Sequence, residues 1–187
     1  IISCIMNIET ILTPNPETLK FMVDKTYIFQ SGIEIKNEKE AKKFKFTKDC
    51  FQLKGIKRIF IGENFIAITK KKNITWNYLK TKVLTFILDF ISLNKTLIEK
   101  QIIKKEKKKN RKNKISMEIE KIIDEKVRPA VARDGGDIIF ESFDKGIVYL
   151  TLKGACVGCP SSTATLKQGI ENLLTHYFSE VKEVKSL

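Results

Sequence analysis

Histidine and cysteine are scarce in this chain, which has one histidine and four cysteines among 187 residues. So few cysteines do not make the framework of a disulfide-rich secreted domain. The start of the chain also lacks a basic leader and a clear cleavage site, so it does not match a secretory signal. We therefore expect a reducing compartment, in which closely spaced cysteines favour metal or redox chemistry over structural disulfides.

Long hydrophobic runs are missing as well. The longest apolar stretch covers residues 83–93 and is interrupted by Asp89. It is far shorter than the roughly 20 residues that cross a bilayer as a helix. We expect no transmembrane helix and no membrane insertion.

Acidic residues are too few to balance the basic ones, and the formal charge is +13. The excess is uneven, because residues 115–187 hold nine Lys or Arg and eleven Asp or Glu, whereas residues 100–114 hold nine basic residues and one acidic residue. A basic block of this kind binds nucleic acid, an acidic partner or a membrane surface, or is a solvated linker. It has no interleaved aromatic residue for base stacking, which favours a linker and disfavours a nucleic-acid partner.

The part before the basic block, residues 6–94, is expected to be a small α+β domain. It starts with two strands around the turn TPNP at 13–16, because prolines at this spacing break a helix. Two more strands are predicted at 56–62 and 64–70. A long amphipathic helix is predicted from about 75 to 93.

Residues 95–114 are expected to be a flexible, lysine-rich linker, because lysines cannot bury the apolar surface that would offset the entropy of ordering. Residues 115–187 predict a helix, two hairpin strands, a second helix and a final strand. Ser116 is expected to cap the first helix, and Pro129 to bend or end it. This order fits a two-layer α+β domain with two helices on one sheet.

Two cysteines lie three positions apart, Cys156 and Cys159, in the segment GACVGCPSS at 154–162. The segment joins a predicted strand to a predicted helix, where free backbone N–H groups and the helix dipole stabilise thiolates. Gly154 and Gly158 permit positive φ angles or a close approach of the backbone. This pattern is typical of a metal-binding or redox-active pair.

A complete metal site usually needs four ligands, and the sequence offers no others near this pair. His176 lies about 25 Å further along the second helix at roughly 1.5 Å per residue, so it is expected to be a surface or packing residue. Cys50 has apolar neighbours and is expected to pack in a core. Cys4 lies near the end of the chain without a partner at a useful spacing.

Several interpretations of the pair remain open at this point. Two chains could meet on a two-fold axis and supply two thiolates each to an iron–sulfur cluster or a zinc ion. The pair could instead serve a thiol–disulfide oxidoreductase, although no aromatic residue precedes the first cysteine. Inert, buried cysteines are disfavoured by the flanking glycines and serines. A nucleic-acid-binding module with a structural zinc is disfavoured by the lack of aromatic residues in the basic block.

The chain resembles the Nfu/NifU-like family in both of its parts. The NifU-type C-terminal domain is matched by RPAVARDGGDIIF at 128–140 and by GIVYLTLKGACVGCPSSTATLKQGIENLL at 146–174. The Nfu N-terminal domain is matched by IETILTPNPETLKF at 8–21, GIKRIFIGENFIAITK at 55–70 and WNYLKTKVLTFILDF at 76–90. These segments come in the family's domain order.

The resemblance implies an iron–sulfur cluster scaffold and carrier, not an enzyme. It implies that Cys156 and Cys159 bind a [4Fe-4S] cluster that bridges a homodimer, and we expect that interface to face solvent. Upstream iron–sulfur assembly proteins would supply the cluster. Apo-enzymes such as lipoyl synthase, aconitase-type enzymes and respiratory-chain subunits would receive it. The expected location is the mitochondrial matrix, with the bacterial cytoplasm as the alternative.

Overall fold

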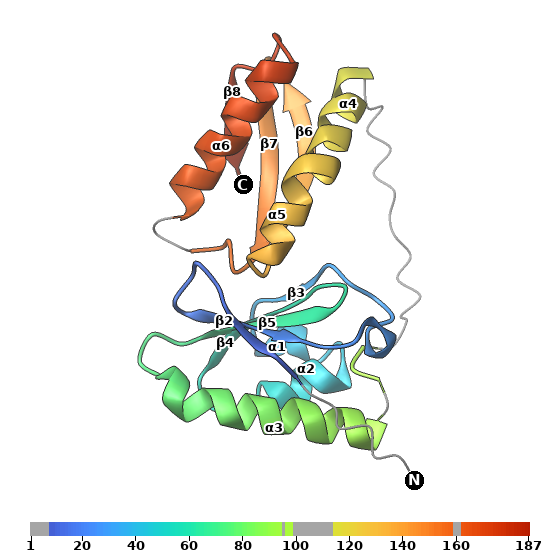
Figure 1. Ribbon diagram of the computed structural model, residues 1–187, viewed down its shortest axis with the longest axis vertical. Helices are drawn as coiled ribbons and strands as arrows, with labels where there is room; N and C mark the ends of the chain where they lie inside the picture. The colour runs from blue at the N-terminus through green and yellow to red at the C-terminus, as the bar shows by residue number, and fades with distance from the viewer. Residues whose placement is uncertain (1–7, 95, 99–113, 159–161) are drawn as a thin grey trace.

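The computed structural model describes residues 8–94, 96–98, 114–158 and 162–187, which form two α+β domains (Figure 1). This arrangement confirms the expected fold class. Within the described ranges, no helix is long and apolar enough to cross a membrane.

The N-terminal domain is a five-stranded antiparallel sheet in the spatial order β1-β2-β5-β4-β3. Its strands are β1 Thr10–Leu12, β2 Thr18–Met22, β3 Ile33–Ile35, β4 Ile56–Ile61 and β5 Phe65–Lys70. Its helices are η1 Lys25–Tyr27, α1 Glu38–Ala41, α2 Lys45–Cys50 and α3 Trp76–Asn94. The predicted strands and the long helix are confirmed, and the TPNP turn joins β1 to β2.

Apolar side chains of the central strands point to both faces of this sheet, and both faces are buried. On one face Phe21 and Ile68 pack against the core side of α3, which contributes Val83 and Ile87. The intervening residues point to the opposite face, because successive side chains of a strand alternate. They are buried too, and they include Lys20, Phe60, Phe65 and Ala67. The domain's own helices cover the first face only, so another part of the chain covers the second.

The C-terminal domain is a three-stranded sheet in the order β6-β7-β8 with helices on one face. Its elements are α4 Lys114–Ile122, the π-helical turn η2 Ile123–Val127, α5 Arg128–Arg133, β6 Gly136–Asp144, β7 Ile147–Gly154, α6 Ser162–Tyr177 and β8 Glu183–Ser186. β6 and β7 form the predicted hairpin, and β8 returns parallel to β7. The order of helix, strand, strand, helix and strand is confirmed.

The first helix of this domain differs from the sequence-based expectation. Ser116 does not cap it, because α4 begins at Lys114 and Ser116 is buried inside it. Ile115 packs against the core and extends the apolar face ahead of the serine. Pro129 does not end the helix either, since the backbone widens into η2 and then continues as α5. The wide turn accommodates Pro129, because the N–H of Arg128 bonds to the carbonyl oxygen of Ile123 and the regular α-helical pattern, which a proline cannot continue, is interrupted there.

Packing against the N-terminal domain continues into the first residues of the expected linker. Leu97 and Ile98 are buried, and Ile98 forms a parallel bridge with Ile28 of the N-terminal domain. These apolar side chains bury surface that the neighbouring lysines cannot, so packing extends past Asn94. The rest of the expected linker up to residue 113 lies outside the described residues.

The C-terminal domain covers the second face of the N-terminal sheet. Figure 1 shows it standing on that sheet, with α3 on the sheet's far side. A small apolar cluster joins the domains, in which Phe60, Phe65 and Ala67 meet Ala132 of α5. The end of the C-terminal domain that rests on the sheet is the end that carries the cysteine loop.

Candidate functional site

The cysteine loop connects the end of β7 at Gly154 to the start of α6 at Ser162, as the sequence predicts. Cys156 is 5% exposed, which differs from the expectation of a solvent-facing site. The cause is its surroundings, because the loop is enclosed by α5 and by the TPNP turn of the other domain. Cys159 lies outside the described residues.

Glycines shape the loop in the two ways expected from the sequence. Gly154 has φ +65° and lies so close to β6 that a Cβ there would be 2.5 Å from the carbonyl oxygen of Gly135. Gly158 has φ +75°, and among the described residues a Cβ there would meet nothing within 4 Å. Gly136 makes room for the Cys156 side chain, since a Cβ there would be 2.5 Å from Sγ of Cys156.

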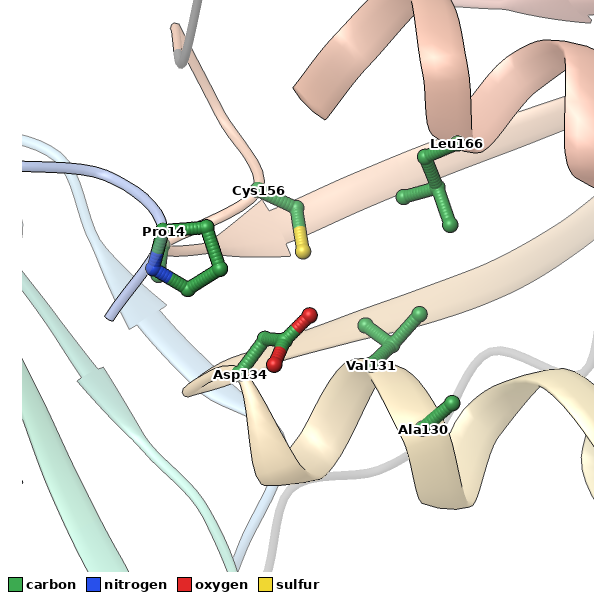
Figure 2. Close-up of a pocket in the computed structure, with 7 residues that line it drawn as sticks. Pro14, Ala130, Val131, Asp134, Cys156 and Leu166 are labelled. Atoms are coloured by element: carbon green, nitrogen blue, oxygen red, sulfur yellow. The ribbon is translucent and has the colours of Figure 1, made fainter. Parts of the chain in front are cut away.

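A small cavity of about 70 Å³ lies beside the Cys156 thiol. Figure 2 shows the sulfur pointing toward Asp134 and Val131 of the opposite wall, with Pro14 on one side and Leu166 on the other. The complete lining is Pro14, Ala130, Val131, Asp134, Ala155, Cys156 and Leu166. Both domains therefore contribute to the immediate surroundings of this thiol.

Asn15 of the TPNP turn binds the backbone of the cysteine loop. Its Nδ2 donates to the carbonyl oxygens of Ala155 at 3.0 Å and of Val157 at 3.4 Å. These two residues flank Cys156 in the sequence. A side chain from the N-terminal domain thus satisfies the carbonyl groups on both sides of the candidate ligand.

Further polar contacts fix the position of the loop relative to the N-terminal sheet. The N–H of Gly154 donates to Oε1 of Glu34 at 3.1 Å, and Nζ of Lys153 donates to the carbonyl oxygen of Gly32 at 3.0 Å. Glu34 also pairs with Arg58 at 3.3 Å. The buried carboxylate is therefore shared between its own domain and the loop.

Lys20 contacts the neighbouring end of α5. Its Nζ donates to the carbonyl oxygens of Ala132 at 2.9 Å and of Arg133 at 3.2 Å. A cation at the C-terminal end of a helix is favourable because carbonyl groups there lack helical partners. Burial lowers the pKa of Lys20 below the ordinary lysine value, and the nearby Asp134 opposes that shift.

The remaining candidate residues stay away from this site. Cys50 is buried in the core of the N-terminal domain, where burial raises the pKa of its thiol far above the usual range. This confirms the prediction of a packing cysteine. His176 is an exposed residue near the end of α6, with its ring edge-on to Tyr177. Cys4 lies outside the described residues.

No cluster of three or more His, Cys, Asp or Glu side chains suited to a metal ion occurs in the part of the chain that the structure describes. Sequence reasoning also missed Pro14, Asn15 and Glu34 as neighbours of the loop. The TPNP motif was a signal for Pro14 and Asn15 only, and it predicts a turn but not what the turn contacts.

Comparison with known proteins adds family matches for both domains. Residues 8–94 match the family model described as "Scaffold protein Nfu/NifU N terminal", and residues 119–185 match the one described as "NifU-like domain". The chain is 34% identical over 183 residues to the human "NFU1 iron-sulfur cluster scaffold homolog, mitochondrial", covering 97% of this chain and 72% of that protein. The chain belongs to the Nfu/NifU-like family of iron–sulfur cluster scaffold proteins.

A plant protein and a solved structure are also similar to the chain. The "NifU-like protein 5, mitochondrial" of Arabidopsis thaliana is 37% identical over 186 residues, covering 96% of this chain and 67% of that protein. The solution structure of a NifU-like protein from Saccharomyces cerevisiae is 27% identical and covers 51% of this chain and 87% of that one, with a TM-score of 0.45. The family is one of non-catalytic scaffold proteins, as the resemblance implied.

Proposed function

We propose that this Nfu-type chain carries a [4Fe-4S] cluster between two copies of itself and passes it to apo-proteins. The ligands are Cys156 and Cys159 of each copy. The observation that carries the proposal is a loop between β7 and α6 with two cysteines at metal-binding spacing, in a chain of a scaffold family. Four thiolates are the ligand number that such a cluster requires, and one chain supplies half of them.

Because each chain supplies only two of the four thiolate ligands, the cluster can be both held and released. Each iron keeps a thiolate ligand while the cluster is bound, and an incoming client thiolate replaces a carrier thiolate one bond at a time. The cluster's charge and oxidation state do not change in this exchange. A single chain with two thiolates cannot complete the ligand set, so separation of the two copies favours release.

Partners and location follow from the same proposal. Upstream iron–sulfur assembly proteins load the carrier, and apo-enzymes of the lipoyl synthase, aconitase and respiratory-chain types receive the cluster. The two relatives quoted above are named as mitochondrial proteins, which supports the mitochondrial matrix as the compartment.

The proposal also includes the division of the chain into two domains, at residues 6–94 and 115–187, which the basic segment joins.

Anaerobic reconstitution with ferrous iron and sulfide tests this function. The expected product is a dimer that holds about two irons per chain, as one four-iron cluster shared by two copies requires. Cys156→Ala and Cys159→Ala should each abolish cluster binding, because either leaves only two thiolates per dimer. Cys50→Ala is the matched control, since Cys50 is buried in the other domain, and it should load normally.

Three results would overturn the proposal. One is a reconstituted protein without a cluster, and another is a full complement of iron on a strict monomer. The third is reduction of insulin disulfides by the cluster-free protein at a measurable dithiol potential. That outcome would assign the pair to thiol–disulfide exchange instead.

A further inference from the structure

The TPNP turn of the N-terminal domain does more than connect two strands. We propose that Asn15 is a positioning residue for the cysteine loop, through which the docked N-terminal domain holds Cys156 in a closed state. The loop must leave this contact before a second copy can share a cluster with it. The need to open before cluster binding rests on the proposed function. The closed state itself is a property of the cluster-free protein.

Both the oxygen and the nitrogen of the Asn15 amide form hydrogen bonds. Its Oδ1 accepts the N–H of Glu17 at 3.0 Å, which closes the turn within its own domain. Its Nδ2 faces the carbonyl oxygens of Ala155 and Val157 in the other domain. Only this orientation of the amide satisfies all three neighbours, because the reverse would place Oδ1 against two carbonyl oxygens. Asn15 is 3% exposed, so water does not compete for these bonds.

The contact extends along the whole start of the loop. Lys153 and Gly154 bind Gly32 and Glu34, and Ala155 and Val157 bind Asn15, so the residues on both sides of Cys156 are tied to the N-terminal domain. The N–H of Gly154 and the carbonyl groups of Ala155 and Val157 keep these partners only while the domains are docked. The N–H groups of Ala155 and Val157 are bonded within their own domain. Movement of the N-terminal domain therefore frees the Lys153 side chain and three backbone groups of the loop together.

The docked state leaves no room for the cargo at Cys156. Its thiol faces a cavity of about 70 Å³ closed on one side by Pro14, a space for a few water molecules. A cluster of eight iron and sulfide atoms whose other ligands come from a second chain is larger than this. A cluster shared with a second chain also requires the Cys156 sulfur to reach the protein surface, whereas Cys156 is buried here. The described geometry is therefore that of a closed apo-protein.

The interface is suited to opening. Apart from the small cluster around Phe60 and Ala67 and the wall formed by Pro14, its contacts include hydrogen bonds between side chains and backbone groups. Water can replace such bonds when the domains separate. Interfaces between domains of one chain commonly permit relative motion unless they are large and hydrophobic.

Thiol labelling of the reduced apo-protein tests the closed state directly. Asn15→Asp is the decisive variant, because the carboxylate still accepts the N–H of Glu17 but cannot donate to the loop. We expect the Cys156 thiol to be alkylated about tenfold faster than in the parent, since buried carbonyl oxygens lose a donor and face a negative charge. The measurement uses a Cys159→Ser background, so that one thiol of the loop is followed by mass spectrometry.

Asn73→Asp is the matched control, because it makes the same substitution at an exposed asparagine of the same domain. It should label at the parental rate. Lys153→Met removes the donor to Gly32 from the other side of the interface and should also accelerate labelling, by a smaller factor. Unchanged or slower labelling of Cys156 in Asn15→Asp would overturn the inference, as would equal acceleration by Asn73→Asp.

Anaerobic loading of the chain with both loop cysteines separates this inference from the proposed function. Asn15→Asp should take up iron and sulfide faster than wild type. If wild type binds a cluster but Asn15→Asp neither labels nor loads faster, the closed state is refuted and the carrier function stands. If Asn15→Asp labels faster but no form of the chain binds a cluster, the carrier function is refuted and the closed state stands.

Discussion

Gly154 offers the sharpest stability prediction, because the chain supplies its own control four residues later. Both Gly154 and Gly158 have positive φ angles, +65° and +75°. They differ in the space around them. A Cβ at Gly154 would lie 2.5 Å from the carbonyl oxygen of Gly135 and 2.9 Å from the ring of Phe60, whereas a Cβ at Gly158 would meet nothing within 4 Å.

The two alanine substitutions therefore share one cost and differ in another. A left-handed conformation costs a non-glycine residue roughly 1–2 kcal/mol, which applies to both. Overpacking adds about 1–3 kcal/mol at Gly154 only, because the atom that its Cβ meets is the backbone carbonyl oxygen of Gly135, directly before β6, and cannot rotate away. We expect Gly154→Ala to lower the free energy of unfolding by about 2–5 kcal/mol and Gly158→Ala by about 1–2 kcal/mol.

Urea titrations followed by far-ultraviolet circular dichroism measure this difference. Fluorescence of Trp76, the only tryptophan, reports the N-terminal domain separately because it belongs to α3. The loss should appear mainly in the circular dichroism transition, since the crowded strands belong to the C-terminal domain. Equal losses for the two variants would refute the argument that close approach, and not φ alone, requires glycine at position 154.

Three further substitutions test the packing of each domain. Cys50→Ala should cost about 1 kcal/mol of stability in a urea titration, because it leaves a small cavity in a closed core. Thr47→Val should cost about 1–2 kcal/mol by the same assay, since the buried Oγ1 donates to the carbonyl oxygen of Ala41 at 2.7 Å. Gly169→Ala should raise the thermal midpoint, with a gain of about 0.5–1 kcal/mol, because a Cβ at this position of α6 meets nothing within 4 Å. A loss of stability in Gly169→Ala, or no loss in the other two, would contradict these assignments.

Local sequence patterns were sufficient to predict most elements of the fold. The hairpin of β6 and β7 and the helix α3 follow from periodicity and turn residues over short spans. The loop between β7 and α6 was located from the paired cysteines and their glycines, and Gly154 and Gly158 adopt the positive φ angles that the sequence suggested.

Contacts between the domains were not predictable from such patterns. Asn15 and Ala155 are 140 positions apart, and nothing in the TPNP motif identifies the backbone that its asparagine binds. The second buried face of the N-terminal sheet was missed for a similar reason. Short strands with apolar residues on both faces predict burial, but they do not say that Phe60 is covered by the other domain.

The start of α4 shows how a local rule can fail. Serine before an apolar periodic segment is a common helix cap, and Ser116 fits that pattern. The structure begins the helix at Lys114 because Ile115 joins the core of the C-terminal domain. Burial of the Ile115 side chain and the added backbone hydrogen bonds of the longer helix together outweigh the gain of a cap at Ser116.

The central claim is that two copies of this chain share one cluster through Cys156 and Cys159. Mössbauer spectroscopy combined with native mass measurement on the reconstituted protein tests it most directly, because the two methods report cluster type and subunit number on one sample. The predicted result is a [4Fe-4S] spectrum on a dimer, lost in Cys156→Ala and retained in Cys50→Ala. A cluster on a single chain, or a spectrum that survives Cys156→Ala, would contradict the claim.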